Sequence, residues 1–396
     1  MAGAIAQQAG YRVMVVEKQE FPRFMIGESL LPKCMEHFEA AGFLDVLKAQ
    51  NYQVKRGVRF VRDNRVCWFD FANQYTESWS WTWQVPRAHF DKVLADALEA
   101  RGVEIVYRTA VTAVRLLEDN SSETTLQHAD GTTSAVRARF IIDASGFGRV
   151  LPRLFDLEKP SGMAPRKALF GHFTDMRRPT TGEGEQITLI IHKRDVWIWV
   201  IPFSDGNTSV GFVGDPAFIN QFDGKPAAEQ LRGLMQLVPF VAKRFLDQTP
   251  TIPASSIEAY AVSAIQTYGP GFAITGNSSE FIDPIFSSGV TFATESGMQA
   301  AQLACRELNG EKVQWKSEYA DHMAQGVETF RTYVNLWYGG TLQDIFFFAQ
   351  DNDVQGEIKR QICSVLAGNV WDMTNPFVNT KRDRILSSLA KLVKIY

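Results

Sequence analysis

The amino-terminal residues most constrain the fold, because they follow the order helix, glycine, strand, acid. Small residues predict a helix over 2–8 that ends near Gly10, and the apolar run 12–16 predicts a strand followed by Glu17. This order is typical of the second half of a dinucleotide-binding βαβ unit, although any parallel α/β protein can show it. The acid normally lies about 20 residues after the start of a glycine-rich loop, so we expect the first strand and that loop to precede residue 1.

Later segments alternate between helical and strand-like patterns. A helix is predicted over 90–101 and a strand over 103–107, and a buried-type strand over 139–143 runs into the glycine-containing turn 144–148. A glycine at a strand end lets the backbone approach a ligand closely, although an ordinary strand-to-loop turn has the same sequence. The alternation favours a doubly wound parallel sheet.

A second type of sheet is predicted in the middle of the chain, where the apolar period shifts toward two. The strands predicted there span 187–192, 196–202 and 208–213. A buried strand over 272–277 then returns the chain to the first sheet. Helical spacing follows over 289–308, and 315–396 is largely helical.

Composition and charge exclude several classes of protein. With 45% apolar and 21% charged residues the chain can bury a substantial core, which excludes a disordered or low-complexity protein. The net charge of −3 gives no field that favours nucleic acid. The longest uncharged stretch, 259–279, contains Gly269-Pro270-Gly271 and polar side chains, so we expect no membrane span.

The cysteines and histidines indicate neither a disulfide framework nor a metal site. The four cysteines form no C-x-x-C pair, and the six histidines have no metal-ligand spacing. We therefore expect a cytoplasmic protein in a reducing compartment, with no bound metal and with histidines in structural roles.

Four motifs resemble those of the flavin-dependent halogenases. Residues 21–32 resemble the segment after the second strand in that family, and 197–202 resemble its W-x-W-x-I-P signature. Residues 281–289 match the F-x-x-P-x-x-S-x-G pattern of the branch that acts on phenols and pyrroles, and Lys55 begins that branch's K-x-G-x-x-F pattern. Indole-acting relatives carry glutamate where this chain has Phe286, so the resemblance disfavours a tryptophan substrate.

The resemblance implies an α/β (α+β) fold that binds FAD. A doubly wound parallel sheet would carry an inserted antiparallel-sheet substrate domain and a helical carboxy-terminal region. The expected divisions are an FAD-binding domain over 1–150 interrupted near 52–86, a mainly antiparallel domain over 151–268, a return to the FAD domain over 269–310 and a helical region over 311–396. The oligomeric state is left open.

The resemblance also assigns residues to the cofactor. Glu17 would hold the adenosine ribose, Val111 would present backbone near the adenine, and Asn277 would hold the ribityl hydroxyls without the charge of the family's aspartate. The expected flavin and diphosphate contacts are Arg23, Ser29 and Arg87. The expected members of the second cofactor motif are Asp143 and Gly146. The other expected cofactor contacts are Asp283, Pro284, Gly289 and Val290.

For halogenation, the resemblance implies that reduced FAD, O2 and chloride or bromide yield hypohalous acid, which travels to a separate substrate pocket. Ser288 and Gly289 would hold the halide through backbone N–H groups at the start of a helix, where the helix dipole favours an anion. In the alternative interpretation, Ser287 merely caps this helix.

Two further features have a chemical and a structural interpretation. Lys55 would hold hypohalous acid by a hydrogen bond or react with it as a haloamine, and partial burial would favour the neutral amine. The alternative is a solvated lysine beside Arg56. Trp197 and Trp199 share a strand face, where the resemblance makes them a wall between flavin and substrate. The alternative is that they fill a sheet core.

We therefore expect an FAD-dependent oxidoreductase that halogenates a small electron-rich aromatic substrate, free or tethered to a carrier protein, and takes reduced FAD from a separate flavin reductase. A monooxygenase or reductase of the same fold stays open, as does a degenerate, non-catalytic flavoprotein. One helical face of 382–396 would contact a membrane surface, a carrier or the protein's own body. That face carries Ile385, Leu389, Leu392 and Tyr396.

Overall fold

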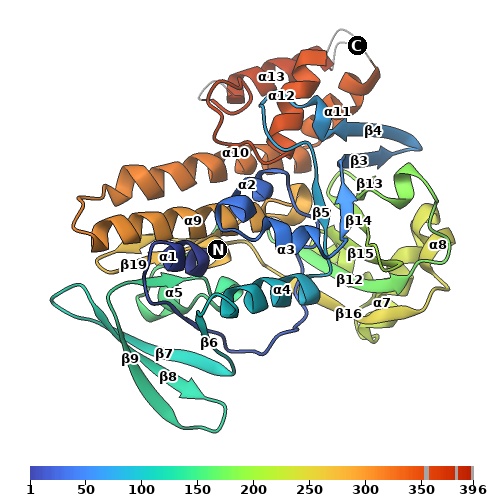
Figure 1. The fold of residues 1–396 in the computed structure, drawn as a ribbon. Coiled ribbons are helices and arrows are strands. Elements are labelled where there is room, and N and C mark those ends of the chain that lie inside the picture. Colours follow the sequence, from blue (N-terminus) through green and yellow to red (C-terminus); the bar gives the residue numbers. More distant parts are fainter. Residues whose placement is uncertain (352–355, 380–381, 394–396) are drawn as a thin grey trace.

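The computed structural model describes residues 1–351, 356–379 and 382–393 and has the predicted α/β class (Figure 1). Strand β1 (Met14–Val16) follows helix α1 (Ala2–Gln8) and pairs in parallel with β6 (Glu104–Val106). Strand β10 (Ile141–Asp143) pairs in parallel with β19 (Phe272–Ile274). Among the described residues, these parallel pairs belong to separate sheets.

Two predicted elements have clearly different bounds in the structure. The helix predicted over 90–101 is α4 (Arg87–Glu99), which begins directly after the extended residue Pro86. The strand predicted over 272–277 ends at Ile274, because the chain turns into a 3-10 helix whose first residue, Gly276, has a φ of +54°. A positive φ is incompatible with a continuing strand, and glycine adopts it without strain.

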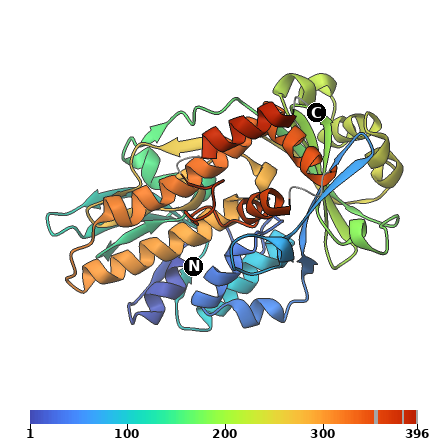
Figure 2. The same ribbon diagram turned by 90° about the horizontal axis from the view of Figure 1, so that it is seen from above.

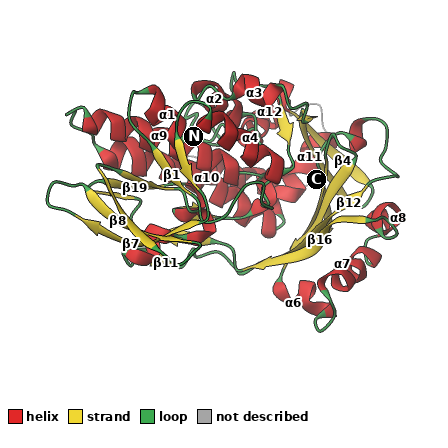
Figure 3. Ribbon diagram, turned by 60° about the horizontal axis from the view of Figure 1, so that its bottom comes forward, coloured by secondary structure: helices red, strands yellow, loops and turns green. Residues whose placement is uncertain are grey.

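The largest sheet of the described residues has seven strands (Figure 3). Its order is β16 (Pro250–Glu258), β12 (Lys167–Thr174), β15 (Asn207–Gly214), β14 (Val196–Pro202), β13 (Thr188–Lys193), β3 (Gly57–Arg62) and β4 (Arg65–Asp70). Most neighbours are antiparallel, but β13 and β3 are parallel. The sheet therefore joins the middle of the chain to an amino-terminal hairpin.

Smaller sheets complete the strand inventory of the described residues. One contains β7 (Thr109–Leu116), β8 (Ser122–His128) and β9 (Thr133–Ala138). Another pairs β2 (Gln53–Lys55) with β5 (Thr82–Gln84). Three short strands form a third sheet, namely β11 (Glu158–Lys159), β17 (Val262–Ala264) and β20 (Glu280–Phe281). Strand β18 (Tyr268–Gly269) extends the β10–β19 pair.

Helices cover the sheets on several sides. Helices α1 and α2 (Lys33–Ala40) pack against α9 (Gly289–Leu308), whose observed bounds agree with the predicted span (Figures 1 and 2). The remaining carboxy-terminal helices are α10 (Asp321–Tyr338), α11 (Thr341–Asp351), α12 (Gly356–Leu366) and α13 (Arg382–Val393). The other helices are α3 (Leu44–Lys48), α5 (Val150–Leu154), α6 (Pro216–Ile219), α7 (Ala227–Gln236) and α8 (Pro239–Phe245).

The described part of the last helix docks on the protein's own body. Leu386 is buried, and Ile385 and Leu389 pack against the main hydrophobic core. The side chains of Leu392 and Tyr396 lie outside the described residues. None of the helices in the ranges 1–351, 356–379 and 382–393 has the length and apolar character of a bilayer span.

Strand β14 lies between two hydrophobic cores, because successive side chains of a strand point to opposite faces of the sheet. Trp197 and Trp199 point into the core that also contains α10 and α11 side chains, whereas Ile198 points toward α7 and α8. Gly211 of β15 lies directly beside the Trp199 ring, where a Cβ atom would come within 2.2 Å of Trp199. Only glycine therefore leaves room for this indole.

We expect Gly211→Ala to lower the free energy of unfolding by roughly 1–3 kcal/mol, because the added methyl group forces the Trp199 indole out of its packed position. Chemical denaturation and tryptophan fluorescence measure this effect. The matched control is Gly356→Ala, since a Cβ at Gly356 would have no neighbour within 4 Å. Equal stability of the two variants would contradict the packing argument.

Candidate active site

The segment 21–32 is held between two different sheets. Leu30 donates its N–H to Trp83 O (3.1 Å), and Val85 donates to Glu28 O (2.7 Å), so the segment runs beside β5. On its other side, Glu28 Oε1 lies 2.6 Å from His172 Nε2 of β12, and both side chains are buried. The segment therefore connects the amino-terminal domain to the seven-stranded sheet.

Lys55 ends β2 in the interior of the protein. Its side chain is 1% exposed, and Nζ donates to Leu30 O at 2.7 Å and lies 5.6 Å from the centre of the Phe71 ring. Burial lowers the pKa of Lys55 to about 7, and interaction with the Cys34 thiol opposes this shift. The interpretation of Lys55 as a solvated surface residue is therefore wrong.

Buried polar atoms without partners gather beside Lys55. Thr82 lies opposite Lys55 in the β2–β5 pair, and Ser29 bridges to Gln84 on the same strand. The atoms Ser29 Oγ, Thr82 Oγ1 and Gln84 Oε1 are buried and have no hydrogen-bond partner in the structure. A buried polar atom without a hydrogen-bond partner lowers the stability of the folded protein. These three atoms are therefore suited to bind a polar ligand. Gln84 Nε2 donates to Pro202 O (2.6 Å), which ties the group to the end of β14.

The two tryptophans of β14 have fixed ring positions. Trp197 is 2% exposed and donates its Nε1–H to Tyr338 Oη (3.0 Å), while Trp199 is 7% exposed and donates to Ser209 Oγ (3.0 Å). The core-filling interpretation is thus confirmed, and the role of a wall between flavin and substrate stays a prediction.

Asp283 joins the last motif to α10. Its carboxylate accepts hydrogen bonds from Tyr338 Oη (3.0 Å), Tyr260 Oη (3.3 Å) and the Ile285 N–H (3.0 Å). Burial raises the pKa of Asp283 to about 6. Asp283 therefore holds its neighbours together, with Pro284 following it in a 3-10 turn. Sequence reasoning missed Tyr338, which is 55 residues away and carries no local signal.

The first turn of α9 has no side-chain cap. Ser288 is the N-cap residue but makes no side-chain capping hydrogen bond, and Ser287 has a left-handed φ of +56°. The interpretation that Ser287 merely caps this helix is therefore wrong. Asn277 Oδ1 would lie 3.9 Å from a Cβ on Gly289, and Val290 Cγ2 would lie 3.7 Å from a Cβ on Gly27. These residues bring the last motif close to the 21–32 segment.

Charged residues predicted to contact the cofactor are brought together. Arg23 lies 3.6 Å from Glu17 and 3.1 Å from Asp91, and Arg87 contacts Asp91 at 2.8 Å. Arg87 also donates to Ile26 O (2.7 Å). Asp91, which sequence reasoning missed, therefore orients both arginines at the amino-terminal end of α4.

The second predicted cofactor motif is organised by Asp143. Its Oδ1 accepts from the Ser145 N–H (2.7 Å) and Ser278 Oγ (3.1 Å), and its Oδ2 accepts from the Leu151 N–H (2.7 Å). Gly146 follows with a φ of +59°, and a Cβ there would meet no atom within 4 Å. Asp143 thus shapes a turn with open space at Gly146. Val111 lies on β7, beside an irregularity in the β7–β8 pairing.

The residues present fit FAD. A bound dinucleotide would use four features of this site. They are the acid after β1, the helix start of α9 without a side-chain cap, the open space at Gly146 and the unpaired buried hydroxyl of Ser29. Together with the fold, they define an FAD-dependent oxidoreductase.

The family model described as tryptophan halogenase matches residues 62–368, and the chain belongs to this family of flavin-dependent halogenases. Its relatives include the 1H-pyrrole-2-carbonyl-[peptidyl-carrier protein] brominase of Pseudoalteromonas luteoviolacea, 26% identical over 81% of this chain and 77% of the relative. Flavin-dependent halogenase armH3 of Armillaria mellea is 26% identical over 78% of this chain and 65% of the relative, so this chain spans less than two thirds of it.

Two solved structures have a fold similar to that of this chain. A flavoprotein/dehydrogenase from Cytophaga hutchinsonii is 49% identical with a TM-score of 0.95, and the match covers 100% of this chain and 95% of that one. The flavin-dependent brominase Bmp2 is 22% identical with a TM-score of 0.83, and the match covers 100% of this chain and 96% of that one. The second likeness shows the fold alone.

We expect Lys55→Met to be more stable than the wild type near pH 7. Folding lowers the pKa of Lys55 from 10.5 to about 7. As the pH falls from about 10.5 to about 7, Lys55 is therefore protonated in the unfolded chain but still neutral in the folded protein. The free energy of unfolding decreases over this pH range, because the proton binds the unfolded state more tightly. Methionine removes this loss, a gain of roughly 3–5 kcal/mol. Urea denaturation between pH 6 and about 10 measures it, and the exposed Lys92→Met is the control. Identical pH dependence in Lys55→Met and wild type would refute it.

Proposed function

We propose that this protein halogenates a small, electron-rich aromatic substrate of the phenol or pyrrole type, using chloride or bromide. The observation that carries the proposal is the buried amine of Lys55, whose pKa of about 7 gives a large neutral fraction at physiological pH. A neutral amine is a nucleophile, whereas an ammonium is not. The fixed position of Nζ on Leu30 O supports a role in chemistry.

FAD would be held by residues from both cofactor motifs. The proposed contacts are Glu17, Arg23, Ser29, Arg87, Val111, Asp143, Gly146, Asn277, Asp283, Pro284, Gly289 and Val290. When bound in reduced form, FAD supplies with O2 the oxidising power that turns halide into hypohalous acid. We propose that a separate flavin reductase delivers it.

The halide would bind at the start of α9. The N–H groups after Ser288 have no side-chain cap, and the positive end of the helix dipole attracts an anion. The left-handed Ser287 supports this assignment, because non-glycine residues held in that region gather at functional sites.

Lys55 would take the halogen from hypohalous acid and pass it on. The neutral amine and hypohalous acid give a haloamine and water, and the haloamine then transfers its halogen to the aromatic carbon. The carbon loses a proton, which returns to the amine nitrogen. Trp197 and Trp199 would keep the substrate away from the flavin during this sequence.

A carrier-tethered substrate is the finer form of this proposal. It is supported by the Pseudoalteromonas luteoviolacea relative, whose name states a pyrrole bound to a peptidyl-carrier protein. A cytoplasmic location is supported by the four cysteines, which are buried and form no disulfide in the described part of the chain.

The second candidate function keeps FAD and changes the chemistry. The relative at 49% identity is named a flavoprotein/dehydrogenase, which favours a monooxygenase or reductase of the same fold. A non-catalytic flavoprotein is the third alternative. Bromide-dependent product formation distinguishes among them.

We expect Lys55→Met to brominate at least about 100-fold more slowly than the wild type, because the halogen can no longer be held on nitrogen. The assay supplies FAD, a flavin reductase, NADH, O2, bromide and a reactive phenol, with free methionine added to destroy hypobromous acid that escapes. Brominated phenol is measured by mass spectrometry at equal NADH consumption.

The control Lys92→Met should brominate like the wild type. Undiminished bromination by Lys55→Met would remove the lysine from the mechanism. Peroxide release without bromination, with or without methionine, would favour the monooxygenase or reductase. Failure of the wild type to bind FAD would favour the non-catalytic protein.

A further inference from the structure

The two tryptophans of β14 are held in different ways. Trp199 donates its N–H to Ser209 Oγ (3.0 Å) on the neighbouring strand β15, so its partner belongs to the same sheet. Trp197 donates its N–H to Tyr338 Oη (3.0 Å) at the end of α10, 141 residues further along the chain. The orientation of the Trp197 indole therefore depends on a residue outside the sheet.

Tyr338 in turn donates to Asp283 of the 281–289 motif. Tyr338 Oη lies 3.0 Å from Asp283 Oδ2. An indole N–H can only donate, and a phenol has a single proton. Because Tyr338 accepts from Trp197, its own proton is free for the carboxylate. The three groups therefore form a chain of hydrogen bonds with one direction, from Trp197 through Tyr338 to Asp283.

Asp283 is 2% exposed, and its titratable and charged neighbours are two phenols and a guanidinium. Tyr260 Oη donates to the same carboxylate oxygen at 3.3 Å, and the Arg166 guanidinium lies 4.0 Å from the centre of the Tyr338 ring. Burial raises the pKa of both phenols well above its ordinary value, so they remain donors. Burial also raises the pKa of Asp283 to about 6, so this carboxyl changes charge near neutral pH.

We propose that Tyr338 and Asp283 are positioning residues for Trp197. Through this chain they keep the indole in the orientation of the proposed wall between flavin and substrate, so that the substrate gains a halogen and not a hydroxyl group. The inference deepens the proposed function, on which it rests for the role of the wall. Asp283 directly precedes Pro284 in the motif that ends at the proposed halide site, so one carboxylate connects that motif to Trp197.

The charge of Asp283 strengthens the whole chain. A hydrogen bond to a carboxylate is stronger than one between neutral groups, and hydrogen bonds in a chain polarise one another. Ionised Asp283 therefore makes Tyr338 Oη a better acceptor for the Trp197 N–H. Protonation of Asp283 weakens both bonds, which makes the Trp197 indole sensitive to pH through Tyr338.

The position of the indole selects between two net reactions. With the substrate kept from the flavin, the sum is FADH2 + O2 + HX + ArH → FAD + ArX + 2 H2O. With the substrate in direct reach, the sum is FADH2 + O2 + ArH → FAD + ArOH + H2O. Both consume the same reduced flavin and O2, so the ratio of ArOH to ArX reports on the wall.

The test follows indole N–H signals by NMR in the full chain, labelled with 15N-tryptophan and supplied with FAD. The Trp197 signal is identified by its absence in Trp197→Phe. We expect its chemical shift to change between pH values of about 8 and about 5, with a midpoint at about 6 where Asp283 is protonated. In Tyr338→Phe and in Asp283→Asn, the Trp197 signal should lose this pH dependence.

Tyr260→Phe is the matched control. Tyr260 donates to Asp283 as Tyr338 does, but the Trp197 N–H donates to Tyr338. We therefore expect Tyr260→Phe to keep the pH dependence of the Trp197 signal. Its midpoint should move to higher pH, because the ionised carboxylate loses one donor.

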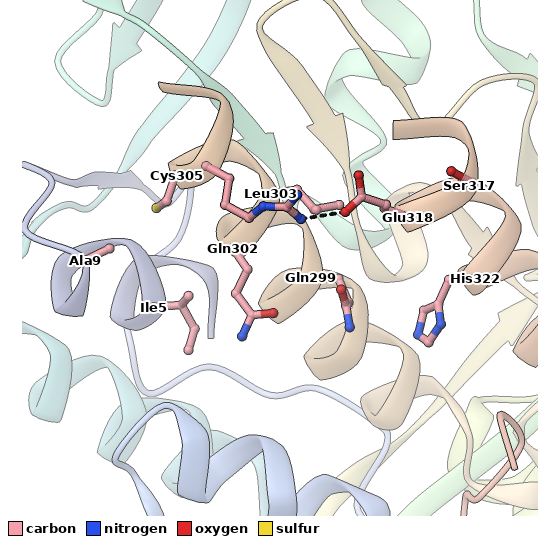
Figure 4. Close-up of a pocket in the computed structure, with 10 residues that line it drawn as sticks. Ile5, Ala9, Gln299, Gln302, Leu303, Cys305, Ser317, Glu318 and His322 are labelled. Atoms are coloured by element: carbon pink, nitrogen blue, oxygen red, sulfur yellow. Dashed lines mark hydrogen bonds and ion pairs between the residues drawn. The ribbon is translucent and has the colours of Figure 1, made fainter. Parts of the chain in front are cut away.

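Trp371 provides an internal reference. Its N–H donates to His322 O (2.8 Å), and its ring stacks on the His322 imidazole with centres 5.2 Å apart. His322 lines a pocket of about 680 Å3 between α1, α9 and the segment before α10 (Figure 4). Its Nε2 lies 2.6 Å from Glu295, which also contacts His37. Any response of the Trp371 signal to this imidazole should be the same in Tyr338→Phe and wild type.

A Trp197 signal that keeps its pH dependence in Tyr338→Phe would overturn the inference, as would a wild-type signal without pH dependence or loss of the dependence in Tyr260→Phe. If Tyr338→Phe fails to fold, Asp283→Asn decides by the same criterion. The measurement needs neither halide nor turnover. Its result is therefore independent of whether the wild type halogenates, which the bromination assay decides separately.

The bromination assay at about pH 7.5 gives a second readout. Tyr338→Phe should raise the ratio of hydroxylated to brominated phenol at least about threefold, the size expected when one hydrogen bond is lost. Tyr260→Phe should keep the wild-type ratio. An unchanged ratio in Tyr338→Phe would overturn the role of the chain in selecting the product.

Discussion

Burial of the Lys55 amine is the constraint on which the rest of the site depends. A lysine that is 1% exposed loses its hydration, and its pKa falls to about 7 unless an opposite charge lies near. Here the nearest partner is the neutral carbonyl of Leu30. The 21–32 segment must therefore be held firmly, which its hydrogen bonds to β5 and the Glu28–His172 pair achieve. The fold thus loses some stability by burying this amine, a loss that is typical of functional sites.

The sequence predicts the parts of this fold that rest on local periodicity. The spans of α1, α9 and β14 agree with prediction. The prediction rested on small residues in α1, on helical apolar spacing in α9 and on strand-like apolar spacing in β14. The strand after 272 was predicted too long, since its end depends on the backbone at Gly276. Motifs located Lys55, but only tertiary packing determines that it is buried. The Tyr338–Asp283 contact and the His37–Glu295–His322 cluster join distant segments, so no spacing rule predicts them.

The tryptophans of β14 show that packing and chemistry need not compete. Trp197 and Trp199 fill a core, yet each indole N–H is committed to one hydroxyl, Tyr338 Oη or Ser209 Oγ. A buried indole N–H that donates one hydrogen bond holds its ring in one orientation. A ring fixed in this way is also a suitable barrier beside a reactive intermediate, because it leaves no room for water. The core-filling interpretation therefore supports the barrier role.

Helix α9 links the parts of the site along one face. Its first turn offers uncapped N–H groups, and Thr291, Thr294 and Glu295 follow at helical spacing in the interior. Gln299 and Gln302 continue the same face into the solvent pocket. At 1.5 Å per residue, this 20-residue helix spans about 30 Å. This polar stripe begins at the proposed halide site and ends at Gln302, in the pocket that His322 also lines.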